Sequence, residues 1–131
     1  MKNYSIGAER HSSDLLERSI EALEKFSKSY SPNNHPCPQI YLGICYERLS
    51  EVKDRRKNLK VAIKHFNDAL KNYKINNSRY DYALIQMHLG NSYGDLSSVE
   101  DDKMNILKSS IDCYCNALKV YILMSSVMIT L

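Results

Sequence analysis

The chain has 131 residues and a net charge of +3, and its composition is 44% hydrophobic and 25% charged. These values are typical of one soluble domain or one array of small repeats. The charge is too small to indicate nucleic-acid binding by itself. The first residues lack the apolar stretch of a signal peptide, and the longest apolar run (120–131) is shorter than the roughly 20 residues that span a bilayer. We therefore expect a cytoplasmic protein without a membrane partner.

Three segments repeat one another and have the periodicity of helices. They read LLERSIEALEKFSKSY (15–30), NLKVAIKHFNDALKNY (58–73) and ILKSSIDCYCNALKVY (106–121). Their shared apolar positions are Leu16, Leu59 and Leu107; Ile20, Ile63 and Ile111; Leu23, Phe66 and Tyr114; and Tyr30, Tyr73 and Tyr121. Steps of four, three and seven residues place these side chains on one face of an α-helix.

A second kind of helical segment alternates with the first: PQIYLGICYERLSE (38–51) and ALIQMHLGNSYGDLSS (83–98). Each has a glycine in register, although a glycine inside a helix costs about 1 kcal/mol relative to alanine. Antiparallel helices approach most closely where both present small side chains. We therefore predict that Gly43 faces Ala62 and that Gly90 faces Ser110. Gly94 has no counterpart and is expected to be exposed near the end of its helix.

These segments resemble the tetratricopeptide repeat (TPR) family. The pattern reads Leu42-Gly43-x-x-Tyr46 with Ala62-x-x-x-Phe66-x-x-Ala69, then Leu89-Gly90-x-x-Tyr93 with Ser110-x-x-x-Tyr114-x-x-Ala117. The spacing is longer than the usual repeat and is similar to that of long-period prokaryotic arrays. The resemblance implies an all-α superhelix, a TPR-like solenoid of about five antiparallel helices, with two full helix pairs and an orphan helix.

The predicted array covers residues 13–131 as one domain, and residues 1–12 form a tail or a truncated helix. The helices are expected at about 14–30, 37–51, 57–74, 79–97 and 102–125. Asp14 followed by Glu17 has the spacing of a capping box and indicates the start of the first helix.

The resemblance implies a non-catalytic interaction scaffold that binds a peptide or a partner protein in a concave groove. The groove would be lined by Ile40, Ile44, Glu47, Arg48, Met87, Asn91 and Asp95. The alternative for Ile40, Ile44 and Met87 is that they pack against neighbouring helices. Only Asn91 matches the family members that clamp a carboxylate, so an apolar or mixed ligand such as an amphipathic helix fits better.

A basic segment, KDRRKNLK (53–60), offers an alternative function as a nucleic-acid-binding helical repeat. In stacked repeats this connection would lie beside the acidic connection VEDDK (99–103). Lys53, Arg55 and Arg56 would then be neutralised within the array, so nucleic acid is not the partner we expect.

Catalysis, cofactors and metals find little support in the sequence. The histidines His11, His35, His65 and His88 are scattered, and none has a second ligand at metal spacing. An exposed surface pair is the simplest interpretation of His65 and Asp68. The cysteines Cys37, Cys45, Cys113 and Cys115 lack CxxC spacing and are interpreted as reduced, small hydrophobic side chains. We expect no enzyme activity, no cofactor and no metal site.

After Tyr121 the chain has no charged residue, and Ile122, Leu123, Val127 and Met128 are apolar. An uncapped end of a helical array exposes a hydrophobic surface. The tail either folds back over the last helix pair or pairs with another copy of the chain, most simply across a two-fold axis. We favour self-association through these four residues, and therefore a homo-oligomer, most simply a homodimer.

Overall fold

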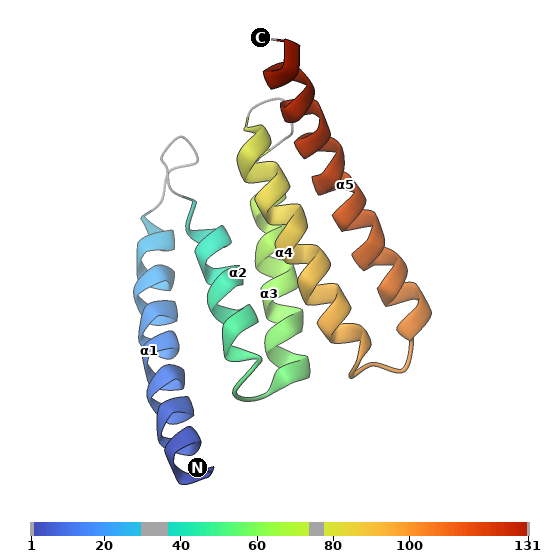
Figure 1. Ribbon diagram of the computed structural model, residues 1–131. Coiled ribbons are helices and arrows are strands. Elements are labelled where there is room, and N and C mark those ends of the chain that lie inside the picture. The colour runs from blue at the N-terminus through green and yellow to red at the C-terminus, as the bar shows by residue number, and fades with distance from the viewer. Residues whose placement is uncertain (1, 30–36, 74–77, 131) are drawn as a thin grey trace. The chain divides into compact units, whose positions relative to one another are not determined.

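The protein is all-α. The computed structural model describes residues 2–29, 37–73 and 78–130, with the side chains of 12–29, 37–73 and 78–126. Five helices cover these residues: α1 (Lys2–Lys28), α2 (Pro38–Leu49), α3 (Arg55–Leu70), α4 (Arg79–Ser97) and α5 (Lys103–Thr130) (Figure 1). No strand occurs in the described ranges, which confirms the predicted fold class.

The helix ends differ from the expected positions mainly at the two termini. α1 begins at Lys2, so Asp14 and Glu17 lie inside the helix and do not cap its start. Residues 2–13 contain no proline, so no residue there prevents the helix from including them. α5 extends to Thr130, because the apolar tail is composed of residues that a helix accepts. Pro38 is at the start of α2, where its missing N–H leaves no hydrogen bond unmade.

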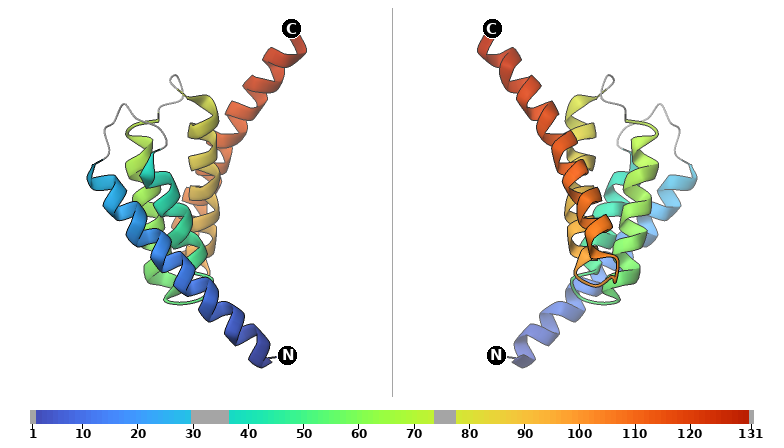
Figure 2. Two further views of the ribbon diagram at one scale, coloured as in Figure 1. Left: turned by 90° about the vertical axis from the view of Figure 1, so that its left-hand side faces the viewer. Right: turned by 90° about the vertical axis from the view of Figure 1, so that its right-hand side faces the viewer.

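The chain divides into two compact units, residues 1–65 and 66–131, and each is described by itself. The N-terminal unit contains α1, α2 and α3 up to His65. The C-terminal unit contains the rest of α3 together with α4 and α5. Within each unit, successive helices run antiparallel (Figures 1 and 2). Because the boundary falls inside α3, this helix contributes side chains to both units.

In the N-terminal unit the core forms between α1 and α2. Ile20 of α1 packs with Leu42 and Leu49 of α2, and partly buried apolar side chains surround them: Leu16, Leu23, Cys45, Tyr46 and Val52. The turn after α2 is held by Asn58, whose buried side-chain amide donates a hydrogen bond of 2.9 Å to the carbonyl oxygen of Lys53. Asp54 in this turn has a φ of 44°, a left-handed backbone conformation.

In the C-terminal unit α4 and α5 approach closely at Gly90. The hydroxyl of Ser110 donates a hydrogen bond of 2.7 Å to the Gly90 carbonyl oxygen, which confirms the predicted facing of these two residues. A Cβ on Gly90 would lie 2.6 Å from two ring carbons of Tyr114. Such a contact is far inside van der Waals distance, so the position requires glycine unless the ring moves.

Gly94 and Gly43, the other two glycines of the predicted helices, are both at least partly buried. Gly94 is half-buried, so the expectation that it is exposed was wrong; it lies near the end of α4, and an added Cβ would sit 3.4 Å from the Ser110 hydroxyl oxygen. Gly43 and Ala62 are both buried in the N-terminal unit, but their facing stays a prediction.

The helices α4 and α5 differ in length: α4 has 19 residues and α5 has 28. The last turns of α5 therefore extend past the first residue of α4 (Figure 2). None of the described helices combines the length and the apolar character needed to cross a bilayer.

Candidate interaction surfaces

The groove residues predicted in the N-terminal unit lie on α2. Ile40 is 6% exposed and belongs to the core, as the packing alternative proposed. Ile44 and Glu47 are half-buried, whereas Arg48 is exposed. Of the predicted α2 groove residues, those open to a ligand are therefore one apolar side chain, Ile44, a carboxylate and a guanidinium group.

The groove residues predicted in the C-terminal unit, Met87, Asn91 and Asp95, lie on α4 one turn apart. Met87 is 38% exposed, and the other two are half-buried. Two tyrosines of α5 hold this surface: the hydroxyl of Tyr114 donates to the side-chain oxygen of Asn91, and that of Tyr121 lies 3.8 Å from the sulfur of Met87. The surface is therefore mixed, with an apolar thioether and polar amide and phenol groups.

The sequence pattern predicted that Tyr114 and Tyr121 pack on the apolar face of their helix, and it did not predict these polar contacts. The repeat itself contains the signal that distinguishes one of them. Phe66 is the equivalent of Tyr114 in the preceding repeat, and it stacks on His88 with ring centroids 5.4 Å apart. Because Tyr114 adds a hydroxyl at this position, it can bind Asn91, which a phenylalanine cannot.

The basic segment 53–60 is partly neutralised inside the N-terminal unit. Lys53 forms an ion pair with Glu17 of α1. The hydrogen bond within this pair raises the pKa of Lys53 above its ordinary value. Both side chains are about half exposed, so the pair contributes little to stability. The predicted approach of this segment to residues 99–103 concerns both units and stays a prediction.

Two shallow depressions with opposite charge lie in the N-terminal unit. The first is lined by Asp54 and four basic residues, Arg55, Arg56, Lys57 and Lys60. The second lies on α1 and is lined by Asp14, Glu17, Arg18 and Glu21. Lys57 and Lys60 are exposed, so cationic groups are accessible at the first depression.

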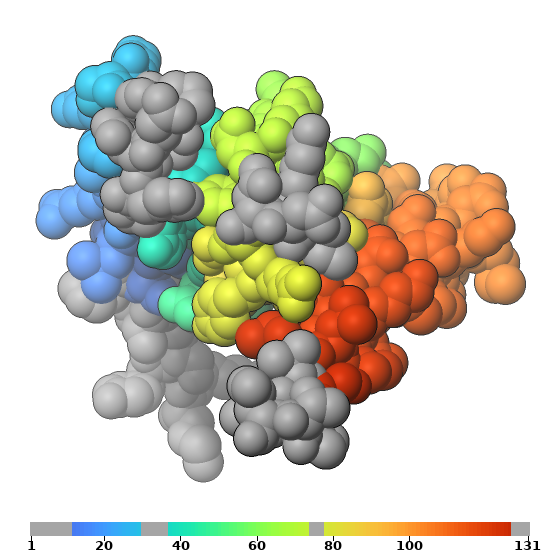
Figure 3. All heavy atoms as spheres, turned by 90° about the horizontal axis from the view of Figure 1, so that it is seen from above, coloured from blue at the N-terminus to red at the C-terminus, as the bar shows by residue number. Residues whose placement is uncertain are grey.

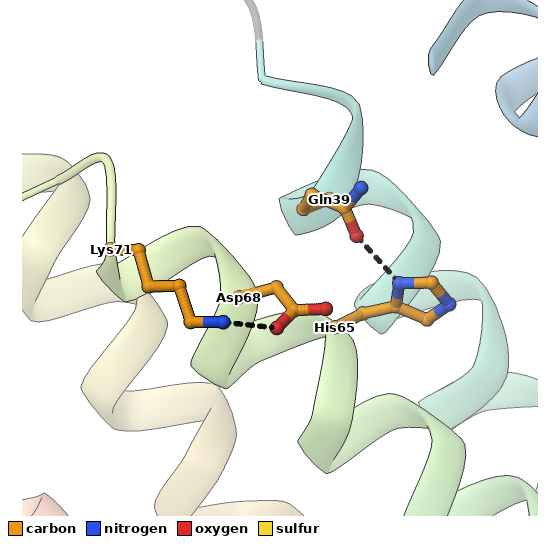
Figure 4. A network of polar contacts seen from close by, with 4 residues as sticks. All are labelled: Gln39, His65, Asp68 and Lys71. Atoms are coloured by element: carbon orange, nitrogen blue, oxygen red, sulfur yellow. Dashed lines mark hydrogen bonds and ion pairs between the residues drawn. The ribbon is translucent and has the colours of Figure 1, made fainter. Parts of the chain in front are cut away.

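His65 and Asp68 on α3 each have a separate partner (Figure 4). Nδ1 of His65 lies 2.6 Å from Oε1 of Gln39, within hydrogen-bonding distance. The His65 ring also stacks on Tyr46 at 5.5 Å. Asp68 binds Lys71 at 3.2 Å. His65 is therefore half-buried and held by packing, which corrects the interpretation of an exposed surface pair.

The cysteines occupy different environments. Cys37 is buried, Cys45 and Cys113 are half-buried, and Cys115 is exposed; all four are free. Burial raises the pKa of the Cys113 thiol, and the neighbouring Asp112 carboxylate adds to this effect. Burial also raises the pKa of Cys45, although Arg48 opposes it. Among the described side chains, no group of three or more potential metal ligands gathers.

Of the four residues predicted for self-association, Ile122 and Leu123 are exposed on α5. Val127 and Met128 belong to α5 by their backbone, but their side chains lie outside the described residues.

The chain has no significant match to a known protein family, to a curated protein or to a solved structure.

Proposed function

We propose that the protein is a non-catalytic interaction scaffold of the TPR type, which binds a peptide or a partner protein and also associates with itself. The observation that supports peptide binding is the mixed surface of the α4–α5 hairpin. There Met87 is accessible and Asn91 lies beside it, with the hydroxyls of Tyr114 and Tyr121 as hydrogen-bonding groups.

This surface suits a ligand with both apolar and polar side chains, such as an amphipathic helix. A tyrosine presents a large contact area and loses little conformational entropy on binding. Tyr114 is restrained further by its hydrogen bond to Asn91 and by its position over Gly90. A preordered surface of this kind gains affinity because less freedom is lost when the ligand docks.

A selection experiment tests this proposal. A library of random 16-residue peptides displayed on phage is selected against the full chain, and the enriched peptides are synthesised and titrated by fluorescence anisotropy. Met87→Lys is expected to weaken binding at least tenfold, because it places a charge on the apolar part of the surface. Met104→Lys is the matched control, since Met104 is a 79% exposed methionine at the start of α5. Equal affinity of Met87→Lys and wild type for every enriched peptide would contradict the proposed surface.

Nucleic-acid binding through residues 53–60 is the second candidate, because Arg55, Arg56, Lys57 and Lys60 line one depression. A labelled 20-nucleotide single strand and a duplex are titrated at 50 and 200 mM salt. Binding to phosphates must weaken steeply with salt, whereas an apolar peptide surface should respond little. Tight, salt-dependent binding that is lost in Lys57→Glu with Lys60→Glu would favour the nucleic-acid function over the peptide scaffold.

A further inference from the structure

One face of α5 carries exposed apolar side chains. The equivalent positions in the preceding repeat, on α3, are buried. Leu59 and Ile63 on α3 are 0% and 9% exposed, whereas their equivalents on α5, Leu107 and Ile111, are 40% and 59% exposed. Two helical turns after Ile111, Leu118 is 56% exposed on α5. The same apolar positions are therefore buried on α3 and exposed on α5.

The exposed side chains form one continuous stripe. We call the α5 stripe Leu107, Ile111, Cys115, Leu118 and Ile122; all five are exposed. Their steps of four, four, three and four residues keep them on one side of the helix. Ser110 and Ala117 are buried on another side, where Ser110 contacts α4. In the view from above, α5 (orange to red) is open along much of its length (Figure 3).

We propose that the α5 stripe docks onto the α5 stripe of a second copy of this chain, with the two helices antiparallel about a two-fold axis near Cys115. This rests on the self-association in the proposed function and moves the interface from the last residues of the chain to the middle of α5. In an antiparallel pair centred there, Ile111 packs against Leu118 of the second copy, and Leu107 packs against its Ile122.

The charges beside the stripe support a second copy as the occupant. Asp112 and Lys119 are exposed, lie on the same edge of the stripe and are seven residues apart. An antiparallel two-fold arrangement brings each Asp112 near Lys119 of the second copy, so the opposite charges meet twice. In a parallel two-fold pair the two edges would lie on opposite sides of the interface, and these charges would not meet. Lys108 is exposed on the same edge and also lies near Lys119 of the second copy, so Asp112 is the one anion between two cations there.

The exposure of the stripe also favours association. Four of its five side chains are 40–59% exposed, so docking would remove substantial apolar surface from water on both copies. Apolar stripes at helical spacing on both partners also allow the side chains to interdigitate as in helix pairs.

The first experiment measures solution mass by size-exclusion chromatography with light scattering over a range of concentrations. The full chain is compared with Ile111→Glu, Leu118→Glu and the control Leu123→Glu. Leu123 is also an exposed apolar residue, but it lies about 100° round the helix from Ile122 and outside the stripe. We expect a dimer for wild type and Leu123→Glu, and at least a hundredfold weaker dimer for the two stripe variants. Circular dichroism checks that each variant is folded.

The second experiment tests the orientation by cross-linking. A short bis-maleimide is expected to link wild-type chains through Cys115, and Cys115→Ser should abolish the covalent dimer while Cys113→Ser retains it. In a Cys115→Ser background, Lys108→Cys should not cross-link, because the antiparallel register separates the two copies of residue 108 by on the order of 20 Å. Efficient linkage through residue 108 would overturn the antiparallel arrangement.

The outcomes separate this inference from the proposed function. A dimer that survives Ile111→Glu and Leu118→Glu but is lost in Leu123→Glu would overturn the α5 stripe and retain self-association through the tail. A wild-type chain that is monomeric at all concentrations would overturn both forms of self-association. Neither result bears on peptide binding, which the Met87→Lys titration tests on its own.

Discussion

Leu59 on α3 and Leu107 on α5 occupy equivalent positions in the internal repeat, yet the first is fully buried and the second is 40% exposed. The same contrast holds for Ile63 and Ile111. Both helices have the apolar periodicity that predicts packing on one face. What differs is the tertiary neighbourhood of that face. An apolar stripe thus indicates where a helix can pack, but the stripe does not tell whether its partner lies in the same chain.

The α3 and α5 helices also differ at their first turns. α3 begins after a turn that the buried Asn58 holds through the carbonyl of Lys53. At the start of α5, the amide of Asn105 donates to both carboxylate oxygens of Asp102 at 3.0 Å, and both residues are exposed. The first turn of α3 is therefore held by a part-buried hydrogen bond, and that of α5 by an exposed one.

The largest expected effect compares the two leucines directly. Leu59→Ala leaves a cavity in a packed interior and is expected to lower the free energy of unfolding by about 3 kcal/mol. Leu107→Ala removes only surface contacts and should change it by about 0.5 kcal/mol or less. Urea denaturation at low micromolar protein concentration measures both, because dimerisation then contributes least. A similar loss for the two variants would show that the α5 stripe is covered within a single chain.

The second prediction concerns the face of α5 that does pack, against α4. Gly90→Ala places a methyl group within 2.6 Å of the Tyr114 ring and is expected to destabilise the fold by about 1–2 kcal/mol, net of a better helix propensity. Gly94→Ala meets only the Ser110 hydroxyl at an ordinary distance and should stabilise the protein by about 0.5–1 kcal/mol. Thermal unfolding distinguishes the signs. Stabilisation by both substitutions would mean that α4 and α5 are less closely packed at Gly90.

The smallest effect is a difference in thiol chemistry between neighbouring residues of α5. Burial raises the pKa of Cys113, so less of it is thiolate at pH 8 than in the unfolded chain. Iodoacetamide should therefore modify Cys113 several-fold more slowly in the folded protein than in urea, and the difference should shrink as pH rises towards 9.5. At protein concentrations low enough for the chain to be monomeric, the exposed Cys115 should react first. Mass spectrometry of peptides assigns each site, and Cys115→Ser serves as the control. Equal rates for Cys113 in the folded and unfolded chain at pH 8 would contradict its burial.

Much of the fold was predictable from local pattern. The helical segments follow from apolar steps of three and four residues, and the close contact of Gly90 with Ser110 follows from two small residues in register. The predicted start of α1 near Asp14 failed, because a capping pattern also occurs inside a continuous helix. The ion pair of Lys53 with Glu17 was not predicted either, since the two residues are far apart in sequence and both have many other possible partners.

The candidate surfaces were predictable only in part for the same reason. The positions of Met87 and Asn91 on one helix face follow from their spacing of four residues. Their hydrogen-bonding contacts with Tyr121 and Tyr114 depend on how α5 crosses α4, which no spacing within either helix specifies. The core position of Ile40 likewise depends on what packs around α2.

By itself, the sequence determined the class of the fold, the number of helices in the described ranges and the apolar face of α1, α3 and α5, because backbone hydrogen bonding and side-chain periodicity are local properties. Tertiary structure alone decided which of those faces are buried. Burial depends on the side chains that a neighbouring element brings from a distant part of the chain, and the described residues leave Ile111 and Leu118 more than half exposed.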